Sequence, residues 1–433
     1  MKIAWCMPVD ERSAIGRFGW AITAELARRG HDVTILASDI ERPAVASPSR
    51  IGFQHIESGC AGAYNESFDV VFYNIGDHFG FHGRILDIVD AVPGIGIFHD
   101  ASIFNFFLGG SRHAGLSAEA EERLVLKHCG STGTQRFQQR AGDSDWFGLC
   151  AELPMVEWIA ERMWGAIAHA GHYIGPISAA CPGPTTKITL AYRPAVMPNP
   201  PAAAKHDPGE IVITTIGRVN ANKCYVEVIE AIAASATLRP SAVYRIFGDS
   251  QPPDRARLTA LASARGVRVE FAETRDDAAL ARCLESTDIV CALRRPILEG
   301  ASGSAIEGLL SGRPVIVADA GFYAELPDRY AVKVPAEVPV PALTAALERL
   351  AADPDGRHAQ GIAARDWALE TFSPARYCDA LEVFMAAYIE AKPLLRLGAD
   401  IGRNLANFGF KREDPAIATI AAAAHGLFVG GKA

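Results

Sequence analysis

Long hydrophobic runs are missing from this 433-residue chain. No stretch of about 18 apolar residues is free of charge, which argues against a membrane-spanning helix. Residues 1–11 hold one lysine, a short apolar run and then acids. A signal peptide needs a longer apolar core and a small-residue cleavage site. We therefore expect a first β-strand there, and a cytoplasmic protein with at most a weak peripheral contact at the inner face of the cell membrane.

Paired cysteines and dense basic clusters are missing as well. The nine cysteines are scattered, odd in number and without a Cys-x-x-Cys pair, which predicts reduced thiols. Only 9 of the 42 basic residues are lysine, and the formal net charge is −8. A nucleic-acid partner is therefore not expected.

The chain is long enough for more than one domain, because a single core stops growing beyond roughly 250–300 residues. Residues 193–201 contain four prolines, and proline ends helices and central strands. We expect an interdomain linker there, between an N-terminal domain at 1–195 and a C-terminal domain at 208–375. Helices within 376–433 are expected to pack back on the N-terminal domain.

Strands and helices are predicted to alternate on both sides of this linker. Short apolar runs predict strands at 2–5, 31–37, 68–73, 95–99, 166–169, 188–192, 211–216, 242–247, 267–271, 288–293 and 315–318. Apolar residues at helical spacing predict intervening helices, among them 16–29 and 82–91, and a last helix at 374–391. This alternation predicts an α/β fold of two Rossmann-like domains, whose parallel sheets face a central cleft that holds the ligand.

A loop rich in small residues follows the strand expected at 288–293. Ser302, Gly303 and Ser304 open the next helix, and a helix N-terminus favours phosphate. Glu299 and Glu307 stand on either side of this loop. Carboxylates beside a phosphate repel it unless they bind hydroxyl groups, so the pattern favours a nucleotide sugar over free phosphate.

A second group of residues follows the strand expected at 211–216, and ligands of open α/β sheets bind at such strand ends. Gly217 and Arg218 come first, and Lys223 follows. The two cations could clamp a diphosphate, or they could be solvated surface residues. Their place in the same sheet as the two glutamates favours the diphosphate site.

Together these motifs resemble the retaining glycosyltransferases of glycosyltransferase family 4, which have the GT-B fold. The C-terminal matches are Gly217-Arg218…Lys223, the Glu299-x7-Glu307 pair, Gly312-Arg-Pro-Val-Ile316, Gly321…Glu325-Leu-Pro327 and Phe372-Ser-Pro374. The N-terminal matches are Ser13-Ala-Ile-Gly16-Arg-Phe18, Gly76…His82 and His99-Asp100. The resemblance covers roughly residues 1–390, and it implies a C-terminal helix that crosses back to the first domain.

The resemblance implies a role for each matching residue. Arg218 and Lys223 would bind the donor diphosphate, Glu299 the hydroxyls of the transferred sugar, and Glu307 those of the ribose. The implied catalytic residues are Glu299, His99, Arg218 and Lys223. The implied donor-binding residues also include Gly16, Gly217, Ser302, Gly303, Ser304 and Glu307. His82 and Asp100 would lie on the acceptor side.

The reaction implied by the resemblance moves a hexose from GDP-mannose or a UDP-hexose to a saccharide or glycolipid acceptor, in bacterial polysaccharide or glycoconjugate synthesis. Front-side attack would retain the anomeric configuration, with no metal and no cofactor. The alternatives are a catalytically silent GT-B module that binds nucleotide sugars, and another GT-B enzyme such as a sugar-nucleotide epimerase. The sequence does not predict the oligomeric state.

For several other residues the sequence is compatible with more than one role. Cys224 stands where the family usually has glycine. Arg294 and Arg295 could contact base or phosphate, or could pair with nearby acids. His169 and His172 could share a metal ion, but no cysteine or carboxylate lies at a supporting spacing, so ordinary histidines are favoured. An irregular insertion is expected at 101–150, with one acidic helix near 117–128, and an alanine-rich tail helix is expected at 417–424.

Overall fold

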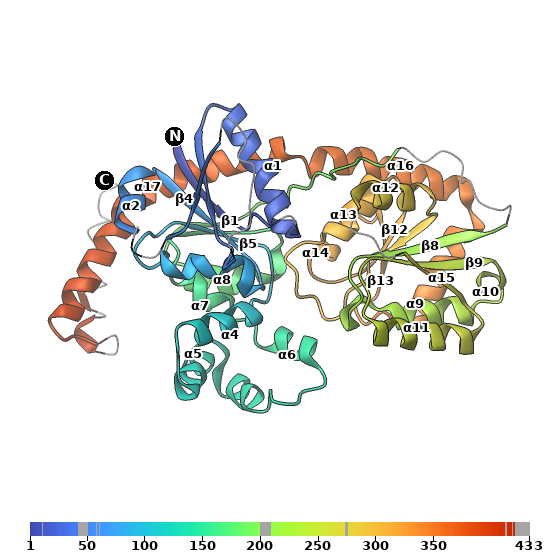
Figure 1. Cartoon of the computed structure of the whole chain (residues 1–433), viewed down its shortest axis with the longest axis horizontal. Coiled ribbons are helices and arrows are strands. Elements are labelled where there is room, and N and C mark those ends of the chain that lie inside the picture. The colour runs from blue at the N-terminus through green and yellow to red at the C-terminus, as the bar shows by residue number, and fades with distance from the viewer. Residues whose placement is uncertain are drawn as a thin grey trace.

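Two parallel β-sheets form the core of the chain, one in each half (Figure 1). The computed structural model describes residues 1–10, 12–41, 51–57, 59, 61–199, 209–272, 276–411, 414–417 and 419–420. The first sheet has the strand order β3-β2-β1-β4-β5-β6-β7 and the second β10-β9-β8-β11-β12-β13. In both, the order reverses beside the first strand of the half, as in Rossmann-like sheets. The predicted fold class is confirmed.

All described strand pairs in the two sheets run parallel. The strands of the first sheet are β1 (Lys2–Met7), β2 (Asp32–Ala37), β3 (Gly52–His55), β4 (Val70–Ile75), β5 (Ile95–Phe98), β6 (Gly165–Ala168) and β7 (Thr185–Lys187). Those of the second are β8 (Ile211–Ile216), β9 (Ala242–Phe247), β10 (Arg268–Ala272), β11 (Ile289–Cys291), β12 (Val315–Ala318) and β13 (Ala331–Val334). The central strands β4 and β8 are buried along their whole length, which is why they are continuous apolar runs.

Helices cover both faces of each sheet (Figure 1). In the N-terminal half they are α1 (Ala14–Arg28), α2 (Ala61–Ser67), α3 (Phe79–His82), α4 (Phe104–His113), α5 (Ala118–Gln138), α6 (Trp146–Glu152), α7 (Val156–Ala160) and α8 (Ile174–Ala180). In the C-terminal half they are α9 (Tyr225–Ala234), α10 (Leu238–Ser241), α11 (Pro252–Arg265), α12 (Asp277–Glu285), α13 (Gly303–Leu310), α14 (Gly321–Ala324), α15 (Val340–Ala352), α16 (Pro354–Thr371) and α17 (Pro374–Asn407). Short 3-10 helices are η1 (Gly83–Asp87), η2 (Gly171–Tyr173) and η3 (Ala221–Lys223).

Two of the expected elements differ in the structure. The strand predicted at 188–192 is wrong: β7 ends at Lys187, and Tyr192 N–H already bonds to Phe372 O, away from the sheet. Ile188 N–H still donates to Ala168 O of β6 over 2.9 Å, and the chain then leaves the sheet. The run is apolar because Ile188 and Ala191 are buried in the core. The helix predicted at 82–91 is instead α3 followed by η1. The insertion expected to be irregular at 101–150 is largely helical, since it contains α4, α5 and most of α6.

Helix α17 joins the two halves of the molecule. It starts after Ser373, whose hydroxyl accepts a hydrogen bond from Arg376 N–H, and then packs against α1 of the first half (Figure 1). This confirms the expected crossing, and the helix is much longer than the predicted 374–391. Of the tail helix expected at 417–424, residues 418 and 421–424 lie outside the described residues.

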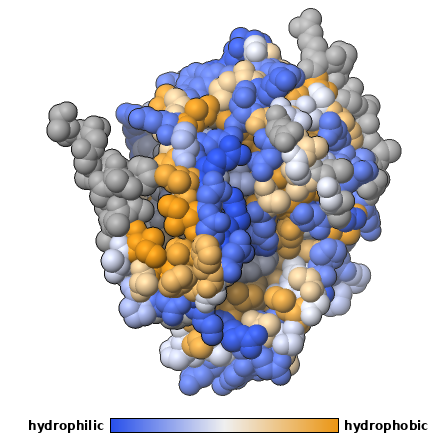
Figure 2. All heavy atoms as spheres, turned by 90° about the vertical axis from the view of Figure 1, so that its left-hand side faces the viewer, coloured by the Kyte–Doolittle hydropathy of each residue, from blue (hydrophilic) through white to orange (hydrophobic). Residues whose placement is uncertain are grey.

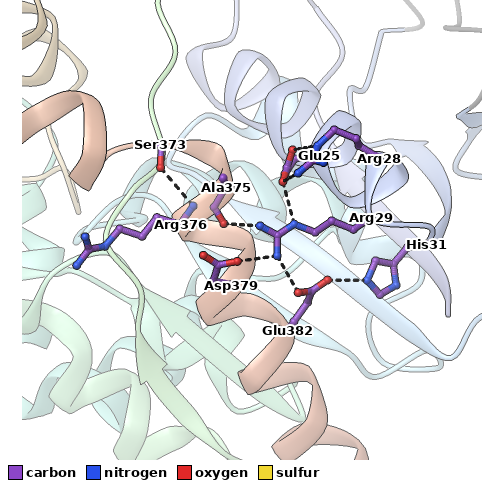
Figure 3. A network of polar contacts seen from close by, with 9 residues as sticks. All are labelled: Glu25, Arg28, Arg29, His31, Ser373, Ala375, Arg376, Asp379 and Glu382. Atoms are coloured by element: carbon purple, nitrogen blue, oxygen red, sulfur yellow. Dashed lines mark hydrogen bonds and ion pairs between the residues drawn. The ribbon is translucent and has the colours of Figure 1, made fainter.

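Charged residues fasten α17 to α1 around Arg29 (Figure 3). The Arg29 guanidinium lies 2.8 Å from both Asp379 Oδ1 and Glu382 Oε2, and 2.9 Å from Glu25 Oε1. The second oxygen of Glu382 lies 3.0 Å from His31 Nε2. The ion pairs therefore supplement the apolar contacts that hold the crossing helix in place.

Replacing Glu382 with glutamine is expected to weaken the acid dependence of stability. Hydrogen bonds from His31 and then Arg29 hold the pKa of Glu382 below its usual value. The stabilisation is therefore present above the unfolded pKa of about 4.3 and is lost as the pH falls through the lower folded pKa. Because the side chain is 35% exposed, the effect on unfolding is at most about 1 kcal/mol.

Urea unfolding of wild type and Glu382→Gln at pH 7 and pH 3 measures this effect. The variant should lose less stability than wild type between the two pH values. Glu370→Gln, which removes a carboxylate from an exposed pair with Arg376, is the matched control. Equal losses in wild type and Glu382→Gln would contradict the assignment.

The far end of α17 extends from the N-terminal half (Figure 1). Its exposed apolar side chains include Leu394 and Leu397, and Phe408 follows directly. Figure 2, which faces this side of the molecule, shows a hydrophobic strip beside strongly hydrophilic surface. Within the described ranges, the helices are too short or too polar to cross a membrane.

Candidate functional site

The two halves meet through main-chain hydrogen bonds between a loop after β5 and a loop after β11. Ala101 N–H donates to Leu298 O over 2.7 Å, and Gly300 N–H donates to His99 O over 2.8 Å. Between these bonds, Asp100 and Glu299 form an antiparallel bridge. The structure therefore brings the predicted acceptor-side residues next to the predicted sugar-binding glutamate, at the carboxyl ends of both sheets.

The Glu299 carboxylate is held mainly through one of its oxygens. Tyr323 donates its hydroxyl to Oε1 over 2.5 Å, and Arg294 Nε lies 3.3 Å from the same oxygen. Among the described residues, the other oxygen, Oε2, has only a long contact of 3.4 Å with Leu298 N. One oxygen is thus fixed by strong donors and the other is left for further partners.

Lys223 is buried beside this carboxylate, with 8% of its surface exposed. Its ammonium donates to Ile216 O over 3.3 Å. Burial lowers the pKa of Lys223 well below its usual value, and the nearby Arg294 lowers it further. Within the described ranges, Lys223 forms no ion pair with a carboxylate. A positive charge on the Lys223 ammonium therefore has no ion-paired carboxylate among the described residues.

The loop after β8 is shaped around Lys223. Gly217 has a φ of +107°, and a Cβ there would lie 2.2 Å from Lys223 Nζ. Cys224 has a φ of 54°, in the left-handed region that favours glycine, the residue that the resemblance leads us to expect here. The structure places Arg218 at the surface of the same loop, and it has no hydrogen bond or ion pair to any described residue.

The second glutamate, Glu307, contacts the N-terminal half. It is 7% exposed, and its Oε1 accepts a hydrogen bond of 2.6 Å from Tyr192. Burial raises the pKa of Glu307, and the Tyr192 hydrogen bond opposes this shift. Nearby, Arg17 of α1 pairs with Asp277 of α12 over 2.9 Å. Both contacts link the two halves at the ribose position that the resemblance implies.

The small residues at the start of α13 lie between the two glutamates. Ser302 caps the helix, because its hydroxyl accepts from Ala305 N–H over 3.3 Å. The Ser304 hydroxyl accepts from Arg294 Nη2 over 2.9 Å. A Cβ at Gly303 would lie 3.1 Å from the Tyr192 ring, so this position allows the halves to approach. Gly16 serves packing within its own half, since a Cβ there would lie 2.7 Å from Pro8 O.

The His99 ring lies below this interface, and both of its nitrogens are engaged. Nε2 lies 3.0 Å from Asn74 Oδ1, and Nδ1 lies 3.2 Å from His169 Nε2. His169 Nδ1 lies 3.0 Å from Ile188 O, and Asn74 Nδ2 donates to Cys6 O over 2.8 Å. Burial lowers the pKa of His99 well below its usual value and that of His169 to about 4.

His82 and Asp100 lie together beneath the loop after β4. A Cβ at Gly76 would be 2.7 Å from His82 Nε2 and 3.2 Å from Asp100 Oδ2. Burial lowers the pKa of His82 to about 3. Burial, with the nearby carboxylate of Asp77, raises the pKa of Asp100 to about 8. The two predicted acceptor-side residues are therefore neighbours.

A protein-family model and several solved structures are similar to this chain. Residues 198–367 match the model of the family described as "Glycosyl transferases group 1". Sucrose-phosphate synthase from Thermosynechococcus elongatus is similar in structure, with TM-score 0.61, 16% identity, and coverage of 89% of this chain and 98% of that chain. The chain has the GT-B fold. None of the curated proteins compared with the sequence matches it.

Two further GT-B structures resemble the chain over most of its length. Anabaena HepE, in complex with UDP and glucose, has a TM-score of 0.58 and 13% identity, covering 89% of this chain and 99% of that chain. WaaG, a glycosyltransferase involved in lipopolysaccharide biosynthesis, has a TM-score of 0.54 and 15% identity, covering 88% and 99%. At these identities the likeness establishes the fold.

Sequence reasoning missed two residues that the fold brings to the site, Tyr323 on Glu299 and Tyr192 on Glu307. Of the alternatives left open for Arg294, the structure shows the pairing with a nearby acid, Glu299. A charged residue directly after a buried strand was the available signal for Arg294, while nothing local marked the tyrosines. His169 is engaged with His99 and Ile188 O, and no group of three or more possible metal ligands is found among the described residues.

Proposed function

We propose that this chain is a glycosyltransferase that transfers a hexose from a nucleotide-diphosphate sugar to a saccharide or glycolipid acceptor. One observation carries the proposal: Lys223 and Arg294 are both buried at the junction of the halves, and among the described residues only Arg294 is ion-paired there, with Glu299. Burying a charge without a partner is costly. A diphosphate would supply the missing negative charge, and the glutamate would bind the sugar hydroxyls. The match to a glycosyl transferases group 1 domain supports the same conclusion.

In the proposed complex the donor lies along the start of α13. Lys223 and the N–H groups near Ser304 would bind its phosphates, with Arg218 closing over them from the surface. Glu307 would exchange the Tyr192 hydroxyl for those of the ribose. The HepE structure contains UDP and glucose in the same fold, which supports a nucleotide sugar. The donor proposed is GDP-mannose or a UDP-hexose.

The proposed reaction retains the anomeric configuration, as in glycosyltransferase family 4. The bond between the sugar C1 and the phosphate oxygen breaks, and the acceptor oxygen bonds to C1 on the same face. The leaving phosphate takes the acceptor proton, so no cofactor or metal is needed. Lys223 and Arg294 stabilise the charge that develops on the phosphate. His99, whose ring nitrogens are both engaged, shapes the floor of the site beside the acceptor residues His82 and Asp100.

The experiment is a panel of nucleotide sugars tested with the purified full chain. A thermal-shift screen of UDP, GDP and ADP sugars first identifies the donor, since a ligand at 100 times its Kd adds about 2.7 kcal/mol of stability. Release of nucleoside diphosphate, with NMR of the product, then tests transfer and the anomeric outcome. Binding of a nucleotide sugar without release of nucleoside diphosphate would indicate a silent binding module. Isomerisation of the donor sugar would indicate an epimerase. Either result would contradict the proposal.

As part of this proposal, the chain acts in bacterial polysaccharide or glycoconjugate synthesis, in the cytoplasm. WaaG, of the same fold, is involved in lipopolysaccharide biosynthesis. Lipid-linked and free saccharide acceptors can be compared in the same release assay. A preference for the lipid-linked acceptor in vesicles would indicate work at a membrane surface.

A further inference from the structure

The Arg294 side chain lies inside the proposed donor site, although it belongs to none of the motifs used to find that site. It is 7% exposed. Its three nitrogens contact three different groups: Nε lies 3.3 Å from Glu299 Oε1, Nη2 donates to Ser304 Oγ over 2.9 Å, and Nη1 donates to Leu293 O over 2.7 Å. The planar guanidinium therefore ties the glutamate loop to the start of α13.

These contacts orient the Glu299 carboxylate. Arg294 and Tyr323 both approach Oε1, one with a positive charge and the other with a hydroxyl at 2.5 Å. Two donors on one oxygen fix the rotation of the carboxylate group. They leave Oε2, with its single long contact at 3.4 Å, as the oxygen with free acceptor capacity.

Arg294 also contributes charge. It lies close enough to Lys223 to lower the pKa of that lysine. The two side chains are buried together, and in the described part of the chain Glu299 is paired with Arg294 while Lys223 is paired with no carboxylate. The guanidinium has five N–H donors, and its three contacts leave part of this capacity for an anion.

We propose that Arg294 is a positioning residue that holds Glu299 with Oε2 toward the sugar of the donor, and that its charge helps to bind the distal phosphate. The inference rests on the proposed function, because it assigns a second role at the same donor site. In this assignment, Arg294 acts on recognition of the sugar through Glu299, whereas recognition of the nucleotide depends mainly on other residues. Loss of Arg294 affects the nucleotide sugar more than the nucleoside diphosphate alone.

Arg295 provides a matched control. It is the neighbouring arginine, but its side chain is 50% exposed and pairs with Glu227 over 2.6 Å. The same substitution, Arg294→Met or Arg295→Met, therefore removes a guanidinium inside the site or outside it. A general effect of losing one positive charge from this loop would appear in both variants.

The experiment measures the Kd values of nucleotide sugar and nucleoside diphosphate by calorimetry, with kcat and KM, for wild type and both variants. Arg294→Met should weaken nucleotide-sugar binding about 10- to 100-fold, the range for a hydrogen bond to a charged group. It should weaken nucleoside diphosphate binding distinctly less, and Arg295→Met should change neither. Arg294→Lys keeps the charge without the planar fork, so it should restore diphosphate binding but not the preference for the sugar.

Two outcomes would overturn the inference and are distinguishable from a failure of the proposed function. If wild type turns over a donor and Arg294→Met keeps the wild-type ratio of the two Kd values, Arg294 does not position Glu299. If wild type binds no nucleotide sugar, the proposed function itself fails and the inference fails with it. Thermal unfolding is measured alongside, and Arg294→Lys carries the comparison if the methionine variant does not fold.

Discussion

Replacing Lys223 with methionine is expected to lower the transfer rate by about 10²- to 10³-fold, as the loss of one preorganised charge donor does. The methylene stem can still fill the space against Gly217, so the fold should be retained. What is removed is the ammonium that lies next to Arg294 with no carboxylate of its own in the described part of the chain. The measurement is kcat and KM with the donor found in the screen.

The same variant should alter how nucleotide binding depends on pH. Burial and Arg294 lower the Lys223 pKa in the free protein, and a bound diphosphate raises it. Binding therefore takes up a proton between the two pKa values, and affinity falls as the pH rises through this window. Calorimetry in two buffers of different ionisation enthalpy counts the proton in wild type. Lys223→Met should not take it up.

Lys333→Met is the control for this result. Lys333 pairs with Asp328 over 2.8 Å on the far strand of the same sheet, so its loss leaves the donor site unchanged. If Lys223→Met keeps the wild-type rate and the wild-type proton uptake, the Lys223 ammonium does not contact the diphosphate.

Replacing Phe18 with alanine is expected to lower the free energy of unfolding by about 3–5 kcal/mol, the usual range for a buried phenylalanine. Phe18, on α1, packs against β1, the residue that follows β5, and the crossing helix α17. Its ring centroid is 4.8 Å from that of His99, 5.1 Å from Tyr377 and 6.3 Å from Trp5. A cavity there removes the contacts of α1 with β1, with His99 at the end of β5, and with α17 at once.

Urea unfolding measures this difference, and Phe408→Ala is its matched control. Phe408 is 80% exposed, so the same truncation should change stability by less than about 0.5 kcal/mol. Similar small losses in both variants would mean that the space left by Phe18 is refilled. Because Phe18 also touches the His99 ring, its loss should reduce activity even under conditions where the variant stays folded.

The fold was predictable because buried parallel strands are continuous apolar runs, as β4 and β8 are. The edge strand β3 was missed for the same reason. β3 is short and alternates exposed with half-buried residues, so it has no such run. The segment 188–192 shows the opposite error, since burial alone made an irregular stretch of chain resemble a strand.

The proximity of the candidate site residues was predictable where these residues follow strand ends. Glu299 and Lys223 come after neighbouring strands β11 and β8 of one sheet, so their proximity follows from the topology. The partners of these residues were not predictable in the same way. Tyr192 reaches Glu307 from the other half of the molecule, and nothing in the sequence distinguishes inward-facing Arg294 from outward-facing Arg295.

The chain of contacts around His99 has a consequence for hydrogen atoms. It runs from Ile188 O through His169, His99 and Asn74 to Cys6 O, and both ends are carbonyl oxygens that can only accept. Four contacts link these groups. Each neutral imidazole and the amide can supply one hydrogen along the line, in whatever tautomer or orientation, so three hydrogens serve four contacts. While both rings remain neutral, one of the four contacts therefore has two lone pairs facing each other with no hydrogen between them. This contact lies beneath the junction of the loops after β5 and β11.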